Sequence, residues 1–255
     1  IHRYLTRRKP LGLELNYAKG WKGDEIDFIK DMPWLHEVRI IDWNIKSVEP
    51  LNCLKEIRSL EVSTYCDTII DFEKMPQLRD CGFEWRPGSN SIFKCKNIEK
   101  LFINSFGEES FDFSQGLRNL EDLDLRNSNI TSLDSFRSAL RLKSLRLVGA
   151  GRLRSLSGLE GLHSLKKLEV EYCKLCSDID FVNSLKSLEF FNLSDNHNIN
   201  SLKPLEHLYN LQTLLFFGST NINDGKLRFL LDLKNLQSVR FKNRRHYDAR
   251  VSEFN

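Results

Sequence analysis

The sequence predicts an α/β solenoid, a right-handed coil of short repeats with one parallel β-sheet along its inner side. The first observation is a string, L-x-x-L-x-L, that recurs along the chain with Phe or Val replacing a leucine in some copies. The second is its spacing, because its first apolar residue returns every 20 to 25 residues from Leu35 to Leu236. The third is that both ends of the chain abandon the string. These features predict about ten or eleven short strands, with irregular or short helical segments on the outer side.

Each copy of the string contains a short strand whose two apolar residues point to one face, because side chains alternate along a strand. A strand of about three residues is not stable alone, but it can join its neighbours about 4.8 Å away in a parallel sheet. Leu13 and Leu15 predict an irregular first strand. The ten regular pairs are Val38/Ile40, Leu60/Val62, Cys81/Phe83, Leu101/Ile103, Leu123/Leu125, Leu145/Leu147, Leu168/Val170, Phe191/Leu193, Leu214/Phe216 and Val239/Phe241.

These copies resemble the leucine-rich repeat family, and most of all bacterial members with 22- to 23-residue units that are similar to internalins. They are also similar to the phosphatase-regulating repeat proteins of eukaryotes. The resemblance implies a leucine-rich repeat arc with a concave sheet. It also implies Asn or Cys five residues after the first strand leucine, bonded to the backbone of the turn. Asn196 and Cys173 match that position, and Ser128 and Ser219 are plausible substitutes. Four coils depart from it, at Trp43, Tyr65, Arg86 and Phe106.

We expect residues 1–255 to form a single repeat domain, because a solenoid extends along one axis without a second core. Its expected parts are a cap and first irregular coil over 1–34, repeats over 35–241, and a C-terminal cap over 242–255. The amphipathic stretch DEIDFIKDM predicts a short capping helix near the start. The ending, STNINDGKLRFLLDL followed by FKNRRHY, resembles that of a bacterial group suggested to be immunity proteins for toxins.

Composition excludes several classes of partner. The net charge is only +3, so the chain carries no strong field for nucleic acid, and no apolar run reaches the roughly 18 residues of a membrane span. The six cysteines include one lone CxxC, Cys173 to Cys176, without the second ligand pair of a zinc site. We therefore expect no metal, no cofactor and no small-molecule substrate. The chain does not need disulfides to build its core, which favours a reducing cytoplasm, with secretion or the cell surface as the alternative.

The predicted binding face consists of the residues that flank the inward strand positions, which alternate in sign and include apolar groups. Such a mixture is typical of protein partners, whereas nucleic-acid surfaces are more uniformly basic. One candidate cluster lies beside Phe106 in the irregular coils and contains Trp85, Arg86 and Phe102. The other lies in the regular coils and contains Asp122, Asp124, Arg126, Arg146, Glu169, Glu171 and Tyr172. Because their side chains point away from the core, we expect charge reversal at Arg126, Arg146, Glu169 or Glu171 to change stability by under about 0.5 kcal/mol.

The sequence predicts a binding scaffold and not an enzyme, because its six histidines are scattered and form no triad pattern with serine, cysteine or carboxylates. No phosphate-binding glycine motif is present either. Three functions stay open. The chain is expected to be a cytoplasmic bacterial immunity protein that covers a toxin, an internalin-like surface or secreted protein that binds a host receptor, or a regulatory subunit that docks on an enzyme.

Overall fold

The computed structural model describes residue 5 and residues 7–254. Within them the chain forms two compact units. The first unit comprises the residues up to Asn104 together with Phe113–Leu120, and the second comprises Ser105–Asp112 with the residues from Glu121 onwards. Both units have the same architecture, in which each coil contributes one short strand and then a return segment.

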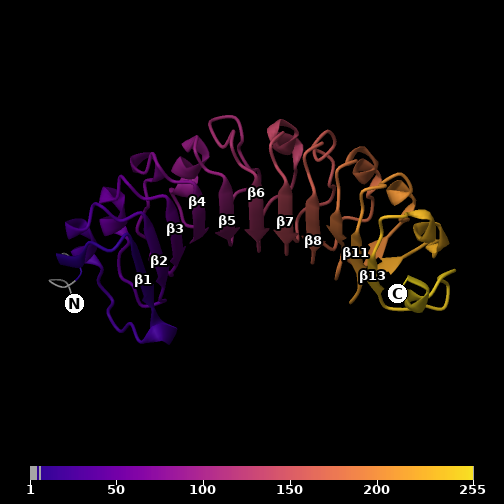
Figure 1. Ribbon diagram of the computed structural model, residues 1–255, viewed down its shortest axis with the longest axis horizontal. Helices are drawn as coiled ribbons and strands as arrows, with labels where there is room; N and C mark the ends of the chain where they lie inside the picture. The colour runs from indigo at the N-terminus through magenta and orange to yellow at the C-terminus, as the bar shows by residue number, and fades with distance from the viewer. Residues whose placement is uncertain (1–4, 6, 255) are drawn as a thin grey trace. The chain divides into compact units, whose positions relative to one another are not determined.

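The first unit contains five parallel strands in sequence order, drawn in indigo to magenta in Figure 1. They are β1 (Gly12–Asn16), β2 (Glu37–Ile41), β3 (Ser59–Ser63), β4 (Asp80–Glu84) and β5 (Lys100–Asn104). The register pairs Leu13 with Val38 and Val38 with Leu60, so the predicted inward residues lie in rows across the sheet. The irregular first strand expected at Leu13 and Leu15 is therefore confirmed as β1.

The return segments of the first unit are short 3₁₀ helices. They are η1 (Tyr17–Lys19), η2 (Asp27–Asp31), η3 (Glu49–Cys53), η4 (Phe72–Lys74) and η5 (Ser89–Lys94). The stretch expected to form a capping helix contains η2, which is a single 3₁₀ segment with Ile29 fully buried. A 3₁₀ helix rises more per residue than an α-helix, so a short return segment can span the coil.

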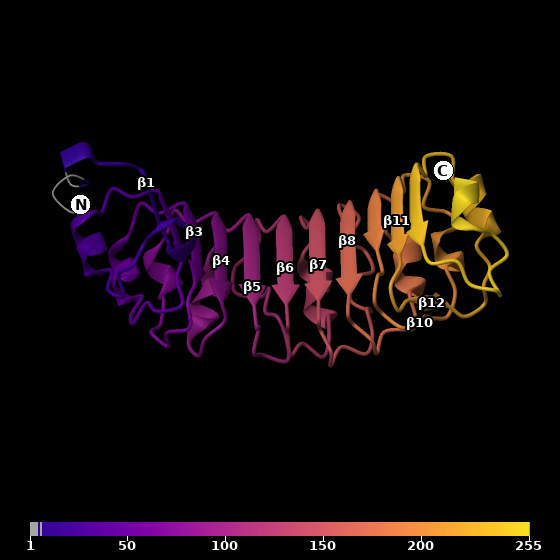
Figure 2. The same ribbon diagram turned by 90° about the horizontal axis from the view of Figure 1, so that it is seen from below.

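The second unit contains six parallel strands, which lie side by side in Figure 2, and a small extra sheet of two strands. The main strands are β6 (Asp122–Arg126), β7 (Ser144–Val148), β8 (Lys167–Glu171), β9 (Phe190–Asn192), β11 (Thr213–Phe216) and β13 (Ser238–Phe241). The extra pair is β10 (Asn198–Ile199) with β12 (Asn221–Ile222). The 3₁₀ segments are η6 (Asp134–Ser138), η7 (Asp180–Ser184), η8 (Lys203–Leu205), η9 (Arg228–Asp232) and η10 (Val251–Phe254).

The core of each unit lies between the sheet and the return segments. The inward strand residues are buried in every strand after β1, including Cys81, as its core position predicts, whereas in β1 Leu15 is buried and Leu13 is half-buried. Aromatic rings extend this core from coil to coil in the second unit. Phe111 packs between Phe106 and Phe136, with ring centroids 5.6 and 5.8 Å away, and Phe216 stacks on Phe241 at 4.7 Å. Phe216 and Phe241 can stack because they occupy equivalent positions on adjacent strands.

Buried polar side chains link successive turns of the second unit. Asn196 accepts a hydrogen bond from the backbone nitrogen of Cys173 at 2.8 Å and donates one to the carbonyl oxygen of Val170. Its own backbone nitrogen donates to the hydroxyl of Thr220 at 3.0 Å. The positions expected for Asn196 and Cys173 are therefore right. The one proposed for Ser219 is wrong, because that residue is exposed and the buried Thr220 takes its place.

The C-terminal tail lies against the last coil of the second unit. Phe241 has the rings of Tyr247 and Phe254 at 5.8 and 5.9 Å, both edge-on. The Tyr247 hydroxyl accepts a hydrogen bond from the backbone nitrogen of Ile222 at 2.9 Å, and Asp248 accepts from the backbone of Leu227 at 2.6 Å. These contacts place aromatic surface and hydrogen-bonding groups over β13, the last strand among the described residues.

Candidate functional site

The regular cluster of candidate residues lies on the exposed face of the sheet in the second unit. Strands β6, β7 and β8 pair in register, so Asp124, Arg146 and Glu169 form one row across the sheet. Arg126 and Glu171 stand in the next row, separated by Val148. Paired residues on adjacent strands are 22 or 23 positions apart in the sequence, and the parallel sheet gathers them into one charged surface.

Arg146 is the centre of an ion-pair network on this face. Its guanidinium lies 3.1 Å from Glu171, 3.8 Å from Glu169 and 4.0 Å from Asp124. Arg126 donates to both carboxylate oxygens of Asp124, the shorter contact being 2.8 Å, and this hydrogen bonding raises the pKa of Arg126. Since each charge is held by a neighbour, the side chains are fixed in place before any partner arrives.

Burial within the network overturns the expectation that every charge reversal on this face changes stability by under about 0.5 kcal/mol. Glu169 is only 8% exposed and pairs with Lys167 at 2.7 Å, so it is not a solvated surface charge. Reversing the charge of Arg146 would add a fourth carboxylate among three that already surround it. Charge reversal at Arg146 should therefore lower the free energy of unfolding by more than the roughly 0.5 kcal/mol that is typical of a surface substitution. Charge reversal at this residue would therefore confound folding with binding.

Tyr172 follows β8 and has an unusual backbone for an aromatic residue. Its φ is +56°, in the left-handed region, and its side chain is 50% exposed. The equivalent residues in five other coils are Ser105, Asn127, Gly149, Asp195 and Gly218, which all have positive φ, so the left-handed turn is a regular feature of these coils. Glycine and short polar residues adopt that region more readily than an aromatic residue does. The negative charge of Asp195, to which the phenol also hydrogen-bonds, raises the pKa of Tyr172. The turn thus holds a rigid, exposed aromatic ring at the border of the charged face.

Asp122 and Phe217 also lie on this face. Asp122 stands at the start of β6, half-exposed and opposite Ser144, on the same side of the sheet as Asp124. Phe217, which follows β11 and is 44% exposed, was not among the candidate site residues predicted from the sequence. The signal was a phenylalanine at a position occupied by polar residues, Glu171 and Ser194, in the two preceding coils.

The other predicted cluster, in the first unit, is divided by the fold. Arg86 is only 4% exposed, and its guanidinium donates to the carbonyl oxygens of Thr64 and Thr68 at 3.4 and 3.3 Å. Trp85 turns its half-buried ring toward the core phenylalanines Phe83 and Phe93. Both residues thus serve the interior of the coil. Phe102 differs, because it stands on the exposed sheet face and lies over Gly82.

Phe106, expected beside that cluster, is fully buried in the second unit, where it packs on Phe111. The sequence marks it only as a departure from the Asn or Cys position. Its ring fills the space that a smaller Asn or Cys at this position would leave open.

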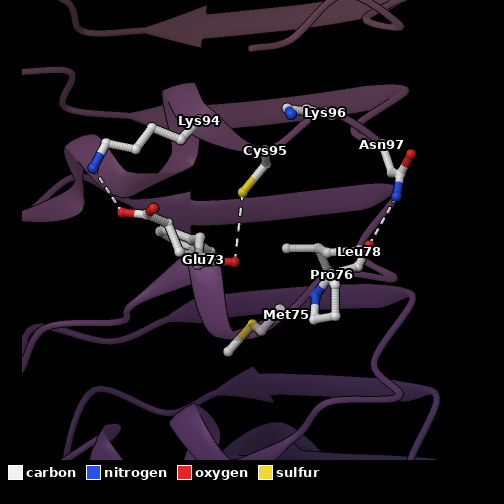
Figure 3. Close-up of a pocket in the computed structure, with 9 residues that line it drawn as sticks. Glu73, Met75, Pro76, Leu78, Lys94, Cys95, Lys96 and Asn97 are labelled. Carbon is white, nitrogen blue, oxygen red and sulfur yellow. Dashed lines mark hydrogen bonds and ion pairs between the residues drawn. The ribbon is translucent and has the colours of Figure 1, made fainter. Parts of the chain in front are cut away.

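One pocket of about 240 Å³ lies on the return side of the first unit, between η4 and the segment after η5 (Figure 3). Its polar groups bind one another, since Lys94 pairs with Glu73 at 2.8 Å and Asn97 donates to the carbonyl oxygen of Pro76 at 2.8 Å. Burial raises the pKa of the Cys95 thiol to about 12, so it is protonated at neutral pH. A protonated thiol is a poor nucleophile, which disfavours cysteine chemistry in this pocket.

The cysteines of the lone CxxC are also packed into the core. Burial raises the pKa of Cys173 to about 11 and that of Cys176 to about 12. The Cys176 sulfur donates to the carbonyl oxygen of Leu153 at 3.2 Å. Among the described residues, histidine, cysteine and carboxylate side chains form no group of three that could hold a metal. In the same part of the chain, no helix has the length and apolar character needed to cross a membrane.

Comparisons with known proteins bear on the fold. No family model matches the chain. Acidic leucine-rich nuclear phosphoprotein 32 family member A of Drosophila melanogaster is 33% identical over 103 residues, and that of Drosophila pseudoobscura pseudoobscura is 32% identical over the same length. The matched segment is 39% of this chain and 39% of each relative, so these relatives extend well beyond the region in common.

Solved structures cover more of the chain. An internalin (InlF) of Listeria monocytogenes superposes with a TM-score of 0.70 at 19% identity, covering 87% of this chain and 66% of the internalin. The functional domain of InlJ from the same organism, described as including a cysteine ladder, gives 0.61 at 17% identity over 89% of this chain and 55% of that domain. The chain therefore folds as a leucine-rich repeat protein with internalin-like architecture, as its repeat predicts.

Proposed function

We propose that this protein is a non-enzymatic scaffold that binds a protein partner through the exposed sheet face of its second unit. The observation that carries the proposal is Tyr172, an exposed aromatic residue held in a left-handed turn where five other coils have serine, asparagine, aspartate or glycine. Glycine, asparagine and aspartate suit this backbone best, whereas a bulky residue with a Cβ costs roughly 1–2 kcal/mol there, so stability alone does not explain a tyrosine. Strain of this kind concentrates at functional sites.

The surroundings of Tyr172 fit a protein partner. Tyrosine and arginine are the residue types that most often dominate the binding energy of protein interfaces. Here Tyr172 borders a network in which Arg146 is fixed by Glu171, and Phe217 adds exposed apolar surface. A fixed network loses little side-chain entropy on binding, so more of the contact energy appears as affinity.

Replacing Tyr172 with glycine should separate binding from folding. The Tyr172→Gly variant loses the ring but keeps a backbone that Gly149 and Gly218 already adopt. We expect the free energy of unfolding to change by less than about 1 kcal/mol, because relief of strain offsets the lost hydrogen bond and the entropy of glycine. Affinity for the partner should fall by about 30-fold, the loss typical of a tyrosine hot spot. Urea unfolding and calorimetry with the captured partner measure the two quantities.

Tyr209 provides the matched control, since it is a comparably exposed tyrosine that follows η8 on the return side of the second unit. Tyr209→Ala should retain full affinity. If Tyr172→Gly binds the partner as tightly as the parent protein, or if Tyr209→Ala loses binding instead, the assignment of the sheet face is wrong.

The finer proposal is that the chain is a bacterial, cytoplasmic immunity protein and that its partner is a toxin. Its support is the resemblance of the chain ending to that group of proteins, together with cysteines whose burial suits a reducing compartment. Affinity capture from the native organism, followed by mass spectrometry, should then identify a toxic protein, and co-expression of this chain should restore growth of cells that make it. Capture of a host receptor would instead support the internalin-like alternative. Capture of a non-toxic enzyme would support a regulatory subunit.

A further inference from the structure

Two exposed aromatic rings of the first unit stack on each other at the ends of β2 and β3. The ring centroids of Trp43 and Tyr65 are 4.5 Å apart with an interplanar angle of 27°, and the residues are 39% and 74% exposed. Both occupy the position five residues after the first strand leucine, where the second unit buries Cys173 and Asn196. We call this the ladder position. In these irregular coils its side chain has turned outward, and the stack faces solvent.

The turns beneath the stack are held by other groups. The backbone nitrogen of Asp42 donates to the carbonyl oxygen of Ser63 at 3.2 Å, and the Asp42 carboxylate accepts from the nitrogen of Asn44 at 2.9 Å. In the next coil Arg86 takes the ladder position but sends its guanidinium inward, to the carbonyl oxygen of Thr64. The row of stacked rings therefore ends at Tyr65, and the exposure of that ring leaves room for one more planar group.

The adjoining sheet face is acidic. The outward residues of β2, β3 and β4 include four carboxylates and one guanidinium, which gives a formal charge of 1 − 4 = −3, against +3 for the whole chain. Of the four carboxylates, Glu84 stands at the end of β4 nearer the stack and Glu61 in the middle of β3, whereas Glu37 and Asp80 stand at the opposite ends of β2 and β4. The single cation, Arg39, is held by Glu61 at 2.6 Å. A surface of this sign attracts cationic groups in a protein whose overall charge is positive.

We infer that the Trp43–Tyr65 stack is a second docking site, and that its occupant is an arginine-bearing segment of a protein partner. A guanidinium is planar and cationic, so it extends an aromatic stack while pairing with nearby carboxylates. Lysine carries the charge without the plane, and a neutral ring has the plane without the charge. Arginine alone satisfies both features of this surface. The site lies in the first unit and does not depend on the sheet face proposed for the second.

The test uses capped hexa-arginine and hexa-lysine peptides with the full chain at about 0.15 M salt, where weak surface attraction is largely screened. Calorimetry should show that hexa-arginine binds about 3- to 30-fold more tightly than hexa-lysine, the range expected for a stacked cation. Tyr65→Ala should weaken hexa-arginine binding by about the same factor and remove the preference over hexa-lysine. Tyr65→Phe keeps the ring and should keep the preference.

Controls make each outcome decisive. Tyr65 is exposed, so circular dichroism should show that Tyr65→Ala folds, and the exposed Tyr209→Ala should bind hexa-arginine normally. Tyr172→Gly should also bind it normally, which keeps this test independent of the proposed function. The inference is overturned if hexa-arginine does not bind, if the two peptides bind equally, or if Tyr65→Ala changes nothing. It is also overturned if maltohexaose, and not the peptide, binds in a manner that requires Tyr65, because the stack would then be a carbohydrate platform.

Discussion

Deletion of residues 242–255 is expected to lower the free energy of unfolding by roughly 3–5 kcal/mol and to make the protein aggregate. The tail places Tyr247 and Phe254 against Phe241, so its loss exposes the apolar end of the last coil. It also removes the carboxylate of Asp248, which accepts hydrogen bonds from the backbone nitrogens of Leu227 and Arg228. An uncovered terminal strand is a template for pairing between molecules, which explains the expected aggregation.

Urea unfolding and the soluble yield after expression measure this effect. Arg245→Ala is the matched control, because Arg245 lies in the same tail and its side chain is exposed. That variant should change the free energy of unfolding by less than about 0.5 kcal/mol. A truncated chain as stable and soluble as the parent would mean that the contacts of the tail contribute nothing to the fold.

Asn196→Ala is expected to cost about 2–4 kcal/mol of stability, a large value for the loss of one polar side chain. Asn196 is 1% exposed and bonds the backbone nitrogen of Cys173 and the carbonyl oxygen of Val170. Alanine would leave both backbone groups buried without these partners, and each such group costs about 1–3 kcal/mol. The damage therefore comes from the stranded backbone more than from the missing amide.

Two companion variants sharpen this test. Asn196→Cys should recover part of the loss, because Cys173 occupies the same position one coil earlier and its thiol donates to a carbonyl oxygen there. Asn183→Ala, at an exposed asparagine of η7, should be nearly neutral. Urea unfolding of the three variants gives the comparison. Equal losses for Asn196→Ala and Asn183→Ala would show that the buried ladder carries no special share of the stability.

The error at Ser219 shows where repeat counting fails. Counting five residues from Leu214 reaches Ser219, yet Thr220 is the residue that bonds Asn196. The turn after β11 contains one residue more, with Gly218 in the left-handed region and the backbone nitrogen of Ser219 donating to Asp195. The turn accommodates the extra residue through its backbone conformation, which cannot be predicted by counting residues between repeats.

By itself, the sequence determined the solenoid, the first strand at Leu13 and Leu15, and the inward register of each later strand. These features follow from burial, because a period of two within each strand and a regular spacing between strands leave one arrangement that hides the leucines. Only the tertiary structure decided which way the ladder side chains turn. Arg86 and Tyr65 occupy equivalent positions, yet the first is buried among carbonyl oxygens and the second is open to solvent. The physical reason is that the direction of a side chain depends on the space and hydrogen-bonding groups that the neighbouring coils offer it, and those become defined only when the coils are stacked.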